Sequence, residues 1–165
     1  MKTINDIIAI FPWTKAEEWK QHDKGKGWVQ ITAYVEATAT IMGVVYGNAQ
    51  VSGDAQVFGD ALVLGNSQVS GNALVFGNAQ VFGDAQVFGN ARVLGDGWEQ
   101  SPHYVQGTKH AATNSKYGYI AIGCQVHTFA HWQANVEEIA RDHGYTEAEV
   151  AEYRAIVDFM VKVGK

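Results

Sequence analysis

The sequence contains only one cysteine, Cys124, so no internal disulfide framework holds the chain together. A chain without disulfides suits a reducing compartment, and we expect a cytoplasmic protein. The N-terminal stretch lacks a small-residue cleavage site, and Asn5 and Asp6 break its apolar run, so we expect no signal peptide. No apolar run approaches the roughly 18 residues that a membrane-spanning helix needs, so no membrane partner is expected.

The chain also lacks an excess of positive charge. It has 12 Lys and Arg against 17 Asp and Glu residues, a formal net charge of −5. No basic stripe stands out along the chain, which argues against a general nucleic-acid-binding protein. With 165 residues, we expect one compact unit with small appendages.

What the sequence does contain is an internal repeat of six residues between Val45 and Gly95. Each unit has valine, a variable residue, glycine, Asp or Asn, a small residue and a variable residue. Such periodicity is the mark of a stack in which each repeat is one structural unit. The repeated valines are Val45, Val51, Val57, Val63, Val69, Val75, Val81, Val87 and Val93.

Six residues suit one short strand followed by a corner. Valine and alanine fall on alternate positions and therefore share one side of a strand, which predicts an inward-facing core. Glycine followed by Asn or Asp tolerates the positive φ of a tight corner. The same alternation begins at Val29 and includes Ile31, so residues 28–97 are predicted to form about four triangular coils of a β-helix. The Asn and Asp residues suggest corner geometry rather than calcium, because a glycine-rich nonapeptide is absent.

The units "VFGDAQ" and "VFGNAR" resemble those of hexapeptide-repeat proteins. This resemblance implies a left-handed parallel β-helix in a mainly β protein; a right-handed stack is the alternative. In the common family form glycine directly follows the aliphatic residue, whereas here one residue separates them.

The outward positions predict three different faces. The first apolar face carries Val44, Tyr46, Leu62, Leu64 and Phe82, and the second apolar face carries Phe58, Leu74, Phe76 and Leu94. The polar face carries Gln50, Ser52, Gln68, Ser70 and Gln86, with Phe88. Apolar patches of this extent are rarely left in solvent. Either the chain's own terminal helices cover them, or copies of the chain pack on them, which predicts a homo-oligomer around a threefold axis.

The two ends of the stack are predicted to be capped. Residues 1–27 are expected to form a helical cap, with a capping box of Thr14 and Glu17 starting a helix over "KAEEWKQH". Tryptophans are expected to plug the open end of the stack. These are Trp13, Trp19 and Trp28.

After the repeats, residues 98–127 predict an irregular β segment and residues 128–165 a helical hairpin. "HYVQGTKHA" and "KYGYIAIGC" are expected to be strands joined by a polar turn at residues 113–116. Thr128 is expected to cap a helix that runs to about His143, closed by Gly144. A capping box of Thr146 and Glu149 predicts a last helix to about Val163, whose apolar side is expected to cover one apolar face of the stack.

Candidate functional residues gather in residues 98–143, where five of the six histidines lie. Histidine and lysine donors with aromatic rings suit a small anion or a nucleotide, and the helix that follows Thr128 points its N-terminal amides toward the same region. We therefore expect a ligand site here, with packing as the alternative role. Its predicted residues are His103, Tyr104, Lys109, His110, His127 and Trp132.

Two other chemistries use Cys124. Cys124 and His127, with His131 four residues on, have the residue types of a zinc site, but a structural site needs four ligands. The same residues contain a cysteine and a histidine, the components of a nucleophilic pair. Both are weaker predictions than an unreactive cysteine, and we predict no metal and no cofactor.

The family resemblance extends the functional alternatives. Many hexapeptide-repeat proteins are trimeric acyltransferases that bind acyl-coenzyme A between prisms and use a histidine base, but residues 45–95 contain no histidine and no inserted loop. His103 or His110 would then act as base. The segments "SPHYVQGTKH", "IGCQVHTFAHW" and "GYTEAEVAEY" resemble the tails of small phage and prophage proteins with such repeats. The hypotheses are an oligomeric phage-type binding protein that holds a small anionic ligand such as a nucleotide signal, an acyltransferase, and an assembly protein without a ligand.

Overall fold

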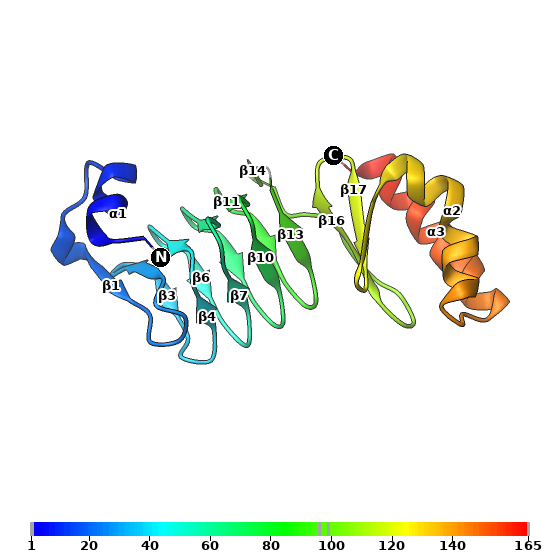
Figure 1. Cartoon of the computed structure of the whole chain (residues 1–165), viewed down its shortest axis with the longest axis horizontal. Coiled ribbons are helices and arrows are strands. Elements are labelled where there is room, and N and C mark those ends of the chain that lie inside the picture. The colour runs from blue at the N-terminus through cyan, green and yellow to red at the C-terminus, as the bar shows by residue number, and fades with distance from the viewer. Residues whose placement is uncertain (1, 96, 99, 165) are drawn as a thin grey trace. The chain divides into compact units, whose positions relative to one another are not determined.

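In a computed structural model of the chain, which describes residues 2–95, 97–98 and 100–164, the repeats form a β-solenoid of about four turns. The chain divides into two units (Figure 1). The first unit comprises Met1–Asn90 and Leu94–Ser101, and the second comprises Ala91–Val93 and Pro102–Lys165.

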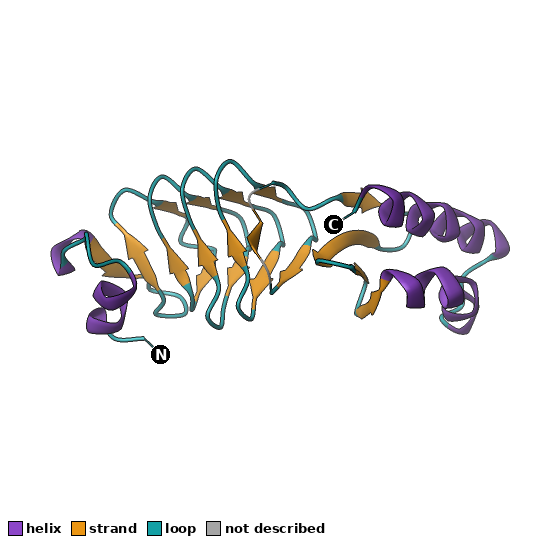
Figure 2. Cartoon of the chain, turned by 90° about the horizontal axis from the view of Figure 1, so that it is seen from above, coloured by secondary structure: helices purple, strands orange, loops and turns teal. Residues whose placement is uncertain are grey.

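Three parallel sheets form the sides of the solenoid, and Figure 2 shows their short strands joined by loops at the corners. The sheet of the first apolar face contains β2 (Trp28–Gln30), β5 (Val44–Val45), β8 (Leu62–Val63), β11 (Gln80–Val81) and β14 (Gly97–Trp98). The sheet of the polar face contains β3 (Tyr34–Val35), β6 (Gln50–Val51), β9 (Gln68–Val69) and β12 (Gln86–Val87). The sheet of the second apolar face contains β4 (Thr40–Ile41), β7 (Gln56–Val57), β10 (Leu74–Phe76) and β13 (Arg92–Leu94).

The valines, alanines and glycines of the repeats play the predicted parts. The valines and alanines of the repeats are fully buried, or nearly so, in the interior of the solenoid. The corner glycines have positive φ values between 60° and 77°. Asn side chains at the corners donate hydrogen bonds to the equivalent corner of the next coil. Asn66 donates to Asp84 and Asn72 donates to Asn90, each at 3.2 Å. Among the described residues of the repeats only glycines have positive φ, contrary to the expectation for the Asn and Asp residues that follow them, whose side chains instead bond from coil to coil.

The first coil is shorter than the sequence pattern suggests. Val29 pairs with Val45, sixteen residues later, whereas Val45 pairs with Val63, eighteen residues later. The first coil is two residues shorter than the next one, and the shortening lies in the corner between Ile41 and Val45. There Gly43 is needed, because a Cβ at this position would lie 2.4 Å from the carbonyl oxygen of Ala61.

Ile31 is not part of the core, contrary to the prediction, and 58% of it is exposed. It occupies the position that the corner glycine takes in later repeats, two residues after the inward valine, so it points out of the turn. In the first coil, two side-chain oxygens accept hydrogen bonds from backbone amides of the next coil. The amide of Gly47 donates to Gln30 Oε1 (3.0 Å) and that of Gly53 donates to Glu36 Oε2 (2.6 Å).

The N-terminal cap contains a helix, but not at the predicted residues. Helix α1 is Ile4–Ile10, with a capping box formed by Thr3 and Asp6. The predicted helix over "KAEEWKQH" is wrong: this stretch forms a 3₁₀ turn, η1 (Ala16–Glu18), and strand β1 (Trp19–Gln21), which pairs antiparallel with β2. Thr14 does not cap a helix because its hydroxyl donates to the carbonyl of Phe11 and accepts from the Trp19 indole.

The N-terminal segment packs on the first apolar face of the solenoid. Buried Ile7, Phe11 and Trp19 contact buried Val44, with Leu62 and Leu64 partly buried against them. The ring of Phe11 stacks on Tyr46 at 4.7 Å. The three predicted tryptophans do not form a common plug, since Trp13 is 68% exposed. The chain's own N-terminal segment therefore covers Val44, Tyr46, Leu62 and Leu64 of this face, in line with one of the two alternatives.

Residues outside the solenoid form a four-stranded antiparallel sheet, the tail sheet, made of β15 (Tyr104–Gln106), β16 (Ala111–Lys116), β17 (Tyr119–Ile122) and β18 (Gln125–Thr128). The predicted turn at residues 113–116 is wrong, because Thr113, Asn114 and Ser115 are buried inside β16. The chain turns instead at Tyr117 and Gly118, where Gly118 supplies a φ of +76°.

Two helices complete the second unit: α2 (Phe129–Asp142), capped by Thr128, and α3 (Glu147–Val163), with the predicted capping box of Thr146 and Glu149. Both predicted starts are confirmed. Their apolar sides pack on Ala112, Ile120 and Ile122 of the tail sheet. The expectation that they cover an apolar face of the solenoid is therefore wrong, because the tail sheet has an apolar face of its own.

Candidate functional site

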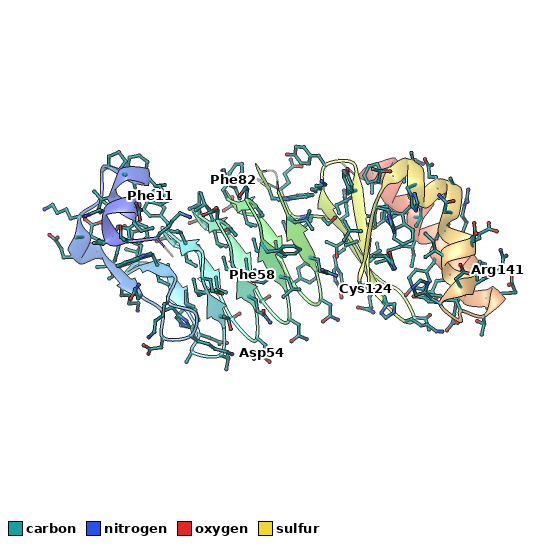
Figure 3. All side chains as sticks on the ribbon, viewed as in Figure 1. Phe11, Asp54, Phe58, Phe82, Cys124 and Arg141 are labelled. Carbon is teal, nitrogen blue, oxygen red and sulfur yellow. The ribbon has the colours of Figure 1, made fainter. Side chains whose placement is uncertain are left out.

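A cavity of about 50 Å³ lies inside the second unit, at the end of the tail sheet where β17 turns into β18. Figure 3 labels Cys124 at this turn. Strands, helices and loops all contribute to the wall. The lining residues are His110, Ile122, Gly123, Cys124, Gln125, Trp132, Val136, Ile139, Ala140, His143, Tyr145 and Tyr153.

The inner wall of the cavity is apolar. Trp132 is 2% exposed, and its indole N–H donates a 2.8 Å bond to the carbonyl of Ile120 on the tail sheet. Val136 and Ala140 follow at helical spacing on the buried side of α2. The indole is thus fixed in orientation and has no donor left for a ligand, so this wall offers only shape and apolar surface.

His110 stands at the rim, between a glycine and an aromatic ring. A Cβ at Gly123 would lie 3.2 Å from Cγ and Cδ2 of the His110 ring, and Gly123 has a φ of +56°. On the other side, the Tyr145 ring lies 6.3 Å away, centroid to centroid. The close approach needs glycine at position 123, and it places the imidazole directly beside the cavity.

The other polar groups of the rim come from α2 and β18. His143 Nδ1 donates to the carbonyl of Ile139 at 2.8 Å, so in the neutral ring Nε2 is an acceptor. Gln125 Oε1 accepts a 3.0 Å bond from His127 Nε2, while its amide N–H groups remain for a ligand. Cys124 has a free, exposed thiol. The rim therefore offers both donors and acceptors around an apolar interior.

The loop that carries His110 is fastened to α3. Thr108 donates from its amide to Glu152 Oε1 (2.9 Å) and from its hydroxyl to Glu152 Oε2 (2.6 Å). The buried hydroxyl of Tyr153 accepts from the amides of Lys109 and His110 and donates to the carbonyl of His110 at 2.7 Å. These bonds hold the His110 wall of the cavity in one place.

Lys109, a predicted ligand residue, is engaged within the protein. Its ammonium donates to the carbonyl of Gly144 at 2.9 Å and pairs with Glu149 at 3.5 Å. It also lies 4.5 Å from the centroid of the Tyr145 ring, on which it forms a cation–π contact. Burial, together with the neighbouring Tyr153 hydroxyl, raises the pKa of Tyr145 to about 12, so this phenol stays neutral near pH 7.

The other predicted ligand residues lie away from the cavity lining, apart from Trp132 and His110. The ring of His103 donates through Nε2 to the carbonyl of Val163 (2.9 Å), and the hydroxyl of Tyr104 donates to Gln106 Oε1 (2.6 Å). The His127 ring stacks on His131 at 4.2 Å and meets the edge of Trp132 at 5.2 Å. Burial lowers the pKa of His127, and the charge of His131 lowers it further.

The predicted anion site at the start of α2 has two of its amides in use. The amide of Phe129 donates to the carbonyl of Gly118 (2.8 Å), and the amide of His131 donates to the Thr128 hydroxyl (3.1 Å). Among the described residues, no group of three His, Cys, Asp or Glu side chains is placed to hold a metal ion, and Cys124, His127 and His131 form no such set.

Sequence reasoning missed Tyr145 and Tyr153 as parts of the site. Tyr145 directly precedes the Thr146 cap, and Tyr153 lies on the side of α3 that its apolar spacing predicts to be buried. These signals place both residues near the tail sheet, but neither indicates that the two rings border a cavity with His110.

Comparison with known proteins bears on the solenoid alone. Residues 55–71, 67–83 and 85–100 match the family model described as "YdcK Beta solenoid repeat". The chain thus carries a YdcK-type β-solenoid repeat. No curated protein and no solved structure was found to match the chain. No helix within the described residues has the length and apolar character to cross a membrane.

Proposed function

We propose that the protein is a binding protein that holds a small ligand in the cavity of its second unit. The observation that supports this is the cavity's combination of an apolar interior with donors and acceptors on a rim fastened to α3. Ligand sites commonly pair an apolar wall with a few placed polar groups. The solenoid would serve as the scaffold.

A matched pair of variants on α2 tests this proposal. Ala140 lines the cavity and is 5% exposed, so Ala140→Leu fills the space, whereas Ala134→Leu adds the same side chain on the exposed side of the helix. We expect a fragment library screened by thermal shift to contain compounds that stabilise the wild type and Ala134→Leu but not Ala140→Leu. Equal responses from all three proteins, or no response at all, would contradict the proposal.

The alternatives from the sequence have less support from the geometry. As an acyltransferase base, His103 would have to act through Nδ1, because its Nε2 donates to the carbonyl of Val163, whereas His110 lines the cavity. A nucleotide ligand, the phage origin, the hexapeptide class and the left-handed winding stay predictions.

Self-association is a second proposal, supported by the second apolar face. Met42, Phe58, Phe76 and Leu94 occupy equivalent outward positions in successive coils, and the rings of Phe58 and Phe76 stack at 5.4 Å. Met42 is 52% exposed, and Phe58, labelled in Figure 3, is half-buried. A continuous apolar column of this kind favours an interface between copies, and we propose that the copies form the trimer predicted above.

A lysine at Phe58 tests this interface. Phe58→Lys puts a charge in the apolar column, and we expect it to convert an oligomer into monomers, as measured by light scattering after size-exclusion chromatography. Phe88→Lys, on the polar face, is the control that should leave the assembly intact. A wild-type monomer, or dissociation of both variants alike, would refute the interface.

A further inference from the structure

The cavity of the second unit has a lining without permanent charge. None of the twelve described residues around it is Asp, Glu, Lys or Arg. The polar groups on the rim are two imidazoles, a thiol, an amide and phenols. Since placing an ionised group in an apolar site without a partner is costly, such a lining disfavours a charged ligand group inside the cavity.

Charged residues beside the rim already have partners within the protein, and one of them, Arg92, donates from its guanidinium to the carbonyl of Gly123 at 2.8 Å. Lys109 is bound by Glu149 and by the carbonyl of Gly144. Glu149 also accepts from the amide of Thr146 at 2.7 Å, and both carboxylate oxygens of Glu152 are held by Thr108. A phosphate or carboxylate at the rim would have to compete with Glu149 for the ammonium of Lys109.

The size of the cavity limits which group enters. An apolar cavity of about 150 Å³ encloses benzene, whereas this cavity has about 50 Å³. A cavity of this size has room for only one edge of a planar ring, against Trp132 and Val136, and the opposite edge would then lie at the rim. There His143 Nε2 can accept a hydrogen bond from the ring, and the Gln125 amide can donate one.

We propose that the cavity selects an uncharged aromatic ring with a polar edge, such as a free nucleobase or a phenol, over the same ring bearing a phosphate or carboxylate. This inference rests on the proposed function and names the chemical class of its ligand. It differs from the anionic ligand predicted from sequence, because Lys109 is committed to the protein and the α2 amides of Phe129 and His131 are in use.

Calorimetric titration of the full chain with matched pairs tests the inference: adenine against AMP, and phenol against 4-hydroxybenzoate, at pH 8. We expect the neutral member of at least one pair to bind, with its charged partner at least tenfold weaker. Ala140→Leu should abolish the binding of the neutral ring, and Ala134→Leu should leave it unchanged.

The outcomes separate the inference from the proposed function. If AMP or 4-hydroxybenzoate binds as tightly as its neutral partner or more tightly, and Ala140→Leu still blocks it, the inference is overturned while the binding cavity stands. Loss of this binding in Lys109→Met would then assign the anion to Lys109. If no compound binds, or if Ala140→Leu binds like the wild type, both the inference and the cavity as ligand site are rejected.

Discussion

Tyr153→Phe is expected to lower the free energy of unfolding of the second unit by about 3 kcal/mol, because a buried polar group left without a partner costs about 1–3 kcal/mol. The Tyr153 side chain is 1% exposed, and its hydroxyl satisfies the amides of Lys109 and His110 and the carbonyl of His110. Phenylalanine keeps the ring but leaves the amides of Lys109 and His110 without this acceptor, while the carbonyl of His110 still accepts from the Gly107 amide at 3.2 Å. Chemical denaturation of the full chain, followed by tryptophan fluorescence, measures the loss.

The same substitution should loosen the wall of the cavity. Amide hydrogen exchange at Lys109 and His110 should accelerate, and any ligand that binds the wild type should bind more weakly. Tyr104→Phe is the matched control, since the hydroxyl of Tyr104 donates to a side chain, Gln106. A Tyr153→Phe protein as stable as Tyr104→Phe, with unchanged exchange at both amides, would show that the hydroxyl does not hold this loop.

Gly71→Ala is expected to destabilise the solenoid by about 3 kcal/mol, of which left-handed backbone strain at a non-glycine residue accounts for about 1–2 kcal/mol. Gly71 has a φ of +70°, and a Cβ there would lie 3.1 Å from both the amide nitrogen and the carbonyl oxygen of Gly89 in the next coil. The backbone of Gly89 cannot move aside without disturbing the 2.8 Å hydrogen bond that its carbonyl accepts from the Asn72 amide.

Gly77→Ala separates the cost of backbone strain from the cost of the close contact between neighbouring coils. Gly77 occupies the equivalent corner position with a φ of +68°, but a Cβ there meets nothing within 4 Å. We therefore expect only the strain, about 1–2 kcal/mol, in urea denaturation followed by far-ultraviolet circular dichroism. Equal losses in the two variants would mean that the spacing between neighbouring coils adds nothing to the need for glycine.

The second unit shows where sequence patterns succeed and where they fail. Local hydrogen bonding decides a helix start, and Thr128 and Thr146 begin α2 and α3 as their spacing from later residues predicts. Thr14 and Glu17 have the spacing of Thr146 and Glu149, yet only the 3₁₀ turn η1 follows and no α-helix forms there. Strand pairing of β1 with β2 and the burial of Trp19 override the local preference there.

The polar composition of residues 113–116 led to the wrong prediction of a turn within strand β16. Thr113, Asn114 and Ser115 look like a turn by composition, but the sheet buries them between β15 and β17. The predicted ligand residues are separated for a related reason, although His110 and Trp132 both line the cavity. His103, Tyr104, Lys109, His110 and His127 are close in sequence, and only His110 lines the cavity, because the antiparallel strands and the loop contacts send neighbouring side chains to different partners.

The sequence by itself determined the solenoid, because a six-residue repeat imposes the same inward valine, inward alanine and corner glycine on every coil. It also determined where α2 and α3 begin, because each cap is a contact between residues three apart. Only the tertiary structure decided what covers the first apolar face and which side chains border the cavity. Those contacts join residues far apart in the chain, such as Phe11 with Tyr46 and His110 with Tyr153, and no local spacing specifies them.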